Sequence, residues 1–87
     1  MNAIPFGQLP LDGQCQYHMA HGAPDQRSIR HLLRLVHDAA QNLRVLLAET
    51  QDPAAGMPAA YRDVWTRALQ VYDEYQQWAS AQLTQEA

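Results

Sequence analysis

The sequence has one cysteine and no long apolar run, and each of these shortages excludes a class of protein. It also has no lysine, so its six basic residues are all arginine. Cys15 alone cannot form an internal disulfide. No stretch approaches the roughly 18 apolar residues that a membrane span needs. The opening residues, MNAIPFGQLPLDG, lack the basic start and the unbroken apolar core of a signal peptide. We therefore expect a cytoplasmic protein without a membrane segment, in which the thiol stays reduced.

The arrangements typical of catalysis are missing as well. A cysteine nucleophile needs a base held within hydrogen-bond reach. Cys15 has His18 and His21 nearby, in a segment rich in glycine and proline that cannot fix them. His37 and Asp38 are adjacent, and adjacent helical residues do not face each other. Since a phosphate-binding glycine loop is also absent, we expect neither an enzyme nor a bound cofactor.

The chain combines a globular composition with a short length. Its 87 residues, 47% hydrophobic and 17% charged, make one small domain. A domain this short buries only about 60% of its unfolded-chain surface, so a metal or a partner commonly adds stability. The net charge of -3 disfavours general binding to nucleic acid.

Apolar residues recur with helical spacing over residues 25–50, which predicts a first long helix. The stripe consists of Ile29, Leu32, Leu33, Val36, Ala39, Ala40, Leu43, Leu46 and Leu47. Asp25 can cap the start of this helix with its carboxylate. Pro53 ends it, because proline lacks the N–H group and moves the preceding residue out of helical geometry.

The same pattern returns over residues 58–84, after a breaker-rich loop at residues 51–57. Pro58 suits the first position of a helix. The second stripe consists of Tyr61, Val64, Trp65, Ala68, Val71, Tyr72, Tyr75, Trp78 and Ala79. Two helices of similar length joined by a short loop predict an all-α fold in which residues 25–87 form an antiparallel helical hairpin.

Residues 1–24 read as an irregular or extended N-terminal arm. Pro5, Gly7, Pro10 and Gly13 interrupt any regular element before the cysteine. The stretch QCQYHMA, residues 14–20, can form a short strand. We expect this arm to pack on the hairpin, with a disordered tail as the alternative.

Both apolar stripes are too wide for a two-helix seam, which needs only two of every seven positions. The excess apolar face needs a cover from the arm, a second copy or another protein. We expect a homodimer with a four-helix core, and we expect a protein as the partner. The aromatic residues of the second helix belong either to this core or to a partner interface, where Trp and Tyr are favoured. The candidates for partner contact are Tyr61, Trp65, Tyr72 and Trp78.

A row of polar residues, four of them arginine, lies opposite the first stripe; we call it the cationic row. Its members step by three or four residues and are Arg27, Arg30, Arg34, His37, Gln41 and Arg44. Three interpretations stay open: an ordinary solvated face, a docking strip for an acidic protein, or a contact with a nucleic-acid backbone. Arginine suits carboxylates and phosphates. The third interpretation is the weakest, because acidic residues interleave with the row.

The stretch CQYHMAH raises the question of a metal site. Cys15, His18 and His21 are donors that zinc accepts, and His31 is a possible fourth. The spacing matches no standard zinc motif, and in a strand Cys15 and His18 would point to opposite faces. We therefore predict no metal, with these four residues as the candidates if one binds.

Together these features predict a small helical protein–protein interaction module, most simply a regulator or inhibitor that occludes a larger protein. One alternative is a structural or assembly adaptor, or a chaperone subunit. Another is a small metal-binding protein that uses the Cys15–His21 stretch.

Overall fold

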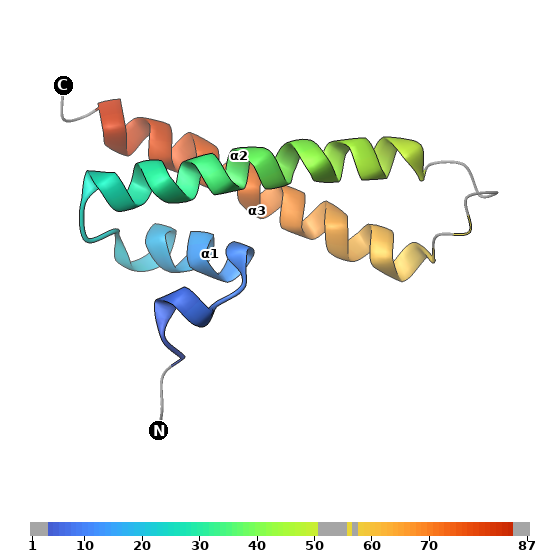
Figure 1. The fold of residues 1–87 in the computed structure, drawn as a ribbon, viewed down its shortest axis with the longest axis horizontal. Helices are drawn as coiled ribbons and strands as arrows, with labels where there is room; N and C mark the ends of the chain where they lie inside the picture. Colours follow the sequence, from blue (N-terminus) through green and yellow to red (C-terminus); the bar gives the residue numbers. More distant parts are fainter. Residues whose placement is uncertain (1–3, 51–55, 57, 85–87) are drawn as a thin grey trace.

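The computed structural model describes residues 4–50, 56 and 58–84, and these residues are helical with no strand among them. A short 3-10 helix, η1 (Phe6–Gln8), precedes the helices α1 (Leu11–His21), α2 (Gln26–Glu49) and α3 (Ala59–Thr84) (Figure 1). The prediction of an all-α fold is confirmed. The fold has three helices, however, instead of two.

Helix α2 forms as its apolar periodicity predicts. The carboxylate of Asp25 accepts a hydrogen bond from the backbone N–H of Ser28 at 2.7 Å, so the predicted cap is present. Four members of the stripe are buried, namely Ile29, Leu32, Val36 and Ala40. The helix ends at Glu49 with Thr50 as its C-cap, and the predicted stop at Pro53 lies outside the described residues.

Helix α3 begins one residue after Pro58, whose carbonyl oxygen accepts hydrogen bonds from the N–H groups of Tyr61 and Arg62. The Arg62 guanidinium donates to the carbonyl oxygens of Leu47 and Thr50 at the end of α2. The last carbonyls of a helix lack partners within it, and a cation placed there is favoured by the helix dipole. Arg62 thereby fastens the start of α3 to the end of α2.

Residues 11–21 form a helix, so the predicted irregular arm at 1–24 and the possible strand at 14–20 are wrong over this segment. Pro10 stands immediately before the first helical residue, where an N–H group is not needed. Gly22 ends the helix at φ 83°, a value that favours glycine. The residues read as breakers therefore bound a helix instead of preventing one.

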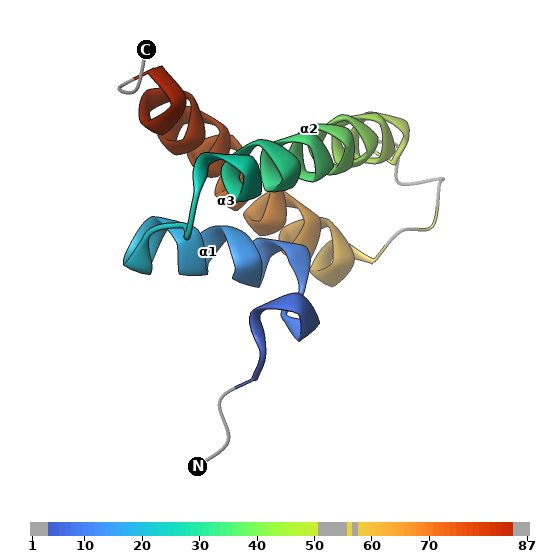
Figure 2. The ribbon, with the colours of Figure 1, turned by 60° about the vertical axis from the view of Figure 1, so that its left-hand side comes forward.

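The core lies between all three helices, at one end of the molecule. Cys15 of α1, Val36 and Ala40 of α2, and Tyr75 and Ala79 of α3 are each 0% exposed. Helix α1 packs mainly against α3. Figures 1 and 2 agree that α1 lies beside the start of α2 and the middle of α3. The end of α2 and the start of α3 extend beyond it, which leaves part of both helices without a third helix.

Candidate protein interface

The apolar stripes of α2 and α3 continue past the point where α1 stops covering them. On α3 the row of positions that holds the buried Tyr75 and Ala79 also holds Val64 and Tyr61, which are 60% and 58% exposed. On α2, Leu46 is a stripe residue and is 39% exposed, and Leu35 at the edge of the stripe is 43% exposed. We call Leu46, Tyr61 and Val64, at the end of the pair that α1 does not reach, the uncovered face.

Val45 is a useful contrast to the uncovered face. It is 54% exposed, about as much as Val64, but the helical repeat puts it on the opposite side of α2 from Val36. Single exposed apolar residues of this kind are ordinary on protein surfaces. Exposed residues that prolong the stripe of a buried core are candidates for an interaction site instead.

The predicted aromatic contacts divide between the core and the surface. Tyr72 is buried in the core of the chain, and Trp65 and Trp78 are partly buried. The Trp78 ring lies 5.5 Å from the Tyr75 ring, centroid to centroid, within an aromatic cluster. Tyr61 is the predicted aromatic residue that remains open to a partner.

The predicted cationic row lies on α2, and its last member is engaged within the chain. Arg27, Arg30 and Arg34 are exposed, and Arg30 donates to the side-chain oxygen of Gln26 at 2.9 Å. Arg44 forms an ion pair with Asp73 of α3. Both side chains of that pair are nearly half exposed, so the pair contributes little to stability.

A shallow depression of about 370 Å³ lies where the cationic row meets α3. Arg30, Arg34 and His37 contribute its cationic side, and Gln76 and Ser80 of α3 complete it. Guanidinium groups in such a setting suit carboxylates of an acidic partner.

The four metal candidates do not converge. Among the residues that the structure describes, no three His, Cys, Asp or Glu side chains lie close enough to hold a metal ion. Cys15 and His18 are buried, whereas His21 and His31 are exposed. Burial, followed by the charge of Asp12, raises the pKa of Cys15 to about 12, so its thiol keeps its proton at neutral pH.

The residue whose setting the sequence did not reveal is His18. Its Nδ1 atom lies 2.7 Å from the hydroxyl oxygen of Tyr75, and its side chain is only 2% exposed. Leu11, Cys15, His18 and Met19 follow the helical spacing of four, seven and eight residues on α1. That spacing is the signal that was available, and a histidine in an apolar position concealed it.

None of the described helices is both long enough and apolar enough to span a membrane. Comparisons of the chain with models of protein families, with curated proteins and with solved structures find no match.

Proposed function

We propose that this chain is a small helical protein–protein interaction module that docks through the uncovered face. The observation that carries the proposal is the exposure of Leu46, Tyr61 and Val64 on stripes whose other members, such as Ala40, Tyr72 and Tyr75, are buried. Leaving such side chains in water forfeits roughly 25 cal/mol per Å² of apolar surface that a partner would cover. Tyrosine beside aliphatic residues is a common composition for an interface centre.

The occupant we infer for the uncovered face is a second copy of the chain. A two-fold axis brings the same face of each copy together, so one apolar patch supplies both sides of the interface. The α2 and α3 helices of the two copies then form a hairpin-on-hairpin contact with a four-helix core. Each α1 covers the other end of its own chain, where it does not interfere with this contact.

The biological role that fits this arrangement is a regulator or inhibitor that occludes a site on a larger protein. Self-association through the uncovered face leaves Arg27, Arg30 and Arg34 free on the opposite side of α2. Exposed guanidinium groups orient a complex and raise its rate of formation more than they add affinity. An acidic surface is therefore the partner that this row suits. An assembly adaptor is the second role, and an activity assay on the captured target separates the two.

Molecular mass in solution tests the proposal first. We expect analytical ultracentrifugation at micromolar concentration to give a dimer, and Val64→Glu to give a monomer because two carboxylates would be buried at the interface. Val45→Glu is the matched control: it introduces the same charge at a similarly exposed valine on the other side of α2, so the dimer should persist.

A monomeric wild-type chain would refute self-association. The wider proposal then depends on capture from the native host with three baits. A target retained by the wild type and Val45→Glu but lost with Val64→Glu supports docking through the uncovered face. Equal retention by all three baits contradicts it.

A further inference from the structure

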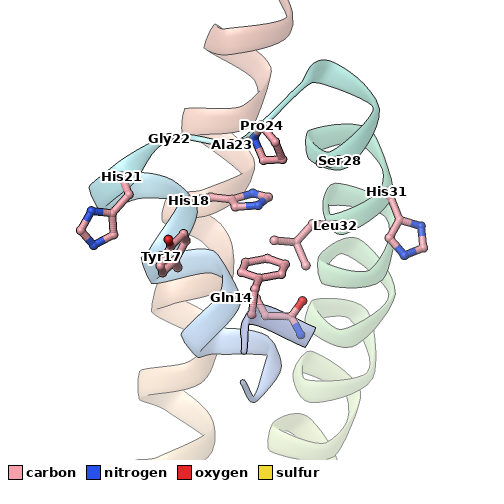
Figure 3. A pocket seen from close by; sticks show the side chains of 11 residues that line it. Gln14, Tyr17, His18, His21, Gly22, Ala23, Pro24, Ser28, His31 and Leu32 are labelled. Carbon is pink, nitrogen blue, oxygen red and sulfur yellow. The ribbon is translucent and has the colours of Figure 1, made fainter. Parts of the chain in front are cut away.

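A cavity of about 540 Å³ opens between α1 and the start of α2, at the opposite end of the α2–α3 pair from Leu46, Tyr61 and Val64. Its walls are mainly apolar and include Phe6, Pro24 and Leu32. Figure 3 shows Tyr17 and His18 of α1 on one side, Leu32 and Ser28 of α2 on the other, and Pro24 between the two helices. Its volume and apolar lining are those of a small-molecule site.

The imidazole of His18 points into this cavity (Figure 3), and Gln14, Tyr17 and Ser28 are further polar residues of the lining. The Phe6 ring stacks on it nearly in parallel, at 7° and 4.9 Å between centroids. Its Nδ1 atom is held by the hydroxyl of Tyr75. The ring is thus fixed on two sides, by a stacked aromatic ring and by a hydrogen bond to α3.

The hydrogen bond to Tyr75 determines which nitrogen of His18 carries the proton. Burial lowers the pKa of His18, which keeps the imidazole neutral at pH 7. Burial also raises the pKa of Tyr75, so the phenol keeps its proton. Among the described residues the fully buried Tyr75 hydroxyl has His18 as its hydrogen-bond partner, so its O–H must donate to Nδ1. A neutral imidazole that accepts at Nδ1 carries its proton on Nε2.

The Nε2–H group of His18 is available to a ligand. In the described part of the chain, the one buried side-chain nitrogen or oxygen without a hydrogen bond is Nε2 of Gln26. The Nε2 atom of His18 has no protein partner there and is not among such buried atoms, so it reaches the surface of the cavity.

The charges around the cavity favour an acceptor group. Among the described residues, the lining includes no aspartate, glutamate or arginine. His21 and His31 lie on opposite rims and point outward (Figure 3). Asp25 and Asp12 are the carboxylates nearest to the lining along the chain, and they accept the N–H groups of Ser28 and Gly13. Nothing on the wall repels a negative group, and His18 offers it a donor.

We propose that this cavity binds a small, flat, apolar carboxylate. The ring system of the ligand lies against Phe6, Pro24 and Leu32, and one carboxylate oxygen accepts the hydrogen bond from His18 Nε2. The cavity is half open, so the second carboxylate oxygen keeps its hydration and only part of the desolvation cost applies. Under that condition the charge-assisted hydrogen bond to His18 favours the carboxylate over its amide.

Three probes of one shape test this assignment on the full chain at pH 7 by isothermal titration calorimetry. They are naphthalene carboxylate, naphthalene carboxamide and naphthylmethylammonium. We expect saturable binding of the carboxylate at one per chain, roughly tenfold weaker binding of the amide, and no binding of the ammonium ion. Failure of all three to bind, or equal binding of all three, overturns the proposal.

The contribution of His18 is tested by the double variant His18→Phe, Tyr75→Phe. It removes both members of the hydrogen bond and keeps their aromatic bulk, which is nearly neutral for stability. We expect carboxylate binding to weaken about tenfold or more in this variant. His37→Ala, which removes a histidine outside the cavity, should leave binding unchanged. Unchanged binding in the folded double variant, or an equal loss in the control, refutes the role of His18.

Discussion

The two ends of the α2–α3 pair carry the same kind of apolar stripe but differ in how far that stripe is buried. At the end that α1 covers, Val36 and Tyr75 are fully buried. At the other end, Leu46 and Tyr61 occupy equivalent positions and remain in contact with water. An apolar stripe therefore indicates that a helix face is to be buried. Whether it is buried depends on another element that packs against it. Here the supplier is α1, and at eleven residues it is less than half as long as α2.

The largest expected difference between the two ends is in the loss of stability when a tyrosine is replaced by alanine at each end. Tyr75→Ala should cost about 3–5 kcal/mol in the free energy of unfolding, since it leaves a large cavity in the core. Tyr61→Ala should cost less than about 0.5 kcal/mol when measured below the concentration of self-association, because Tyr61 is 58% exposed. Urea denaturation of both variants measures the difference. Similar losses would mean that the two ends are equally covered.

A smaller effect is expected from pH, and it belongs to the covered end alone. The pKa of His18 is lowered by burial from its ordinary value of 6.5, so the unfolded chain takes up a proton more readily than the folded chain. The stability contributed by the neutral imidazole is thus fully present above about pH 6.5 and decreases as the pH falls below it. The slope is at most about 1.4 kcal/mol per pH unit.

The pH dependence can be assigned by removing its source. Cys15 and Tyr75, the other titratable groups packed near His18, have raised pKa values and stay protonated through this range. Melting the double variant His18→Phe, Tyr75→Phe from pH 5 to pH 8 should show a shallower slope than the wild type. A slope equal to that of the wild type would assign the effect to the exposed histidines.

A smaller loss than that of Tyr75→Ala is expected near the boundary between the two ends, at Leu43. This residue packs on the core but is only partly buried. Leu43→Ala should cost about 1–2 kcal/mol, below the range for a fully buried leucine. Denaturant melts over a range of protein concentrations provide the measurement. If the loss grows with protein concentration, Leu43 also contributes to the interface between copies.

How much of this structure the sequence predicts depends on how local each cause is. Helix α2 is predictable in full over its described length, because its stripe and its Asp25 cap are both encoded within a few residues. Helix α1 is not, because its pattern includes a histidine where an apolar residue is expected. That histidine is compatible with the core only through Tyr75, which is 57 residues away in the chain. The spacing of residues within α1 cannot reveal a contact with a residue so far along the chain.

The candidate site shows the same division. The excess apolar surface on the two long helices is readable from the sequence, and so is the cationic row on α2. The extent of the uncovered face is not readable, because it depends on where the short α1 comes to rest. The engagement of Arg44 by Asp73, 29 residues further along, is another outcome of tertiary packing.

The reactivity of the single thiol, Cys15, reports on the undocking of α1 from the other two helices. An isolated helix of eleven residues is unstable in water, so α1 keeps its shape only while it stays docked. Cys15 lies in the core between the helices and is fully buried. A thiol reagent can therefore react with Cys15 only when α1 undocks from the other helices. The rate of thiol modification then measures how often α1 undocks, without any engineered probe.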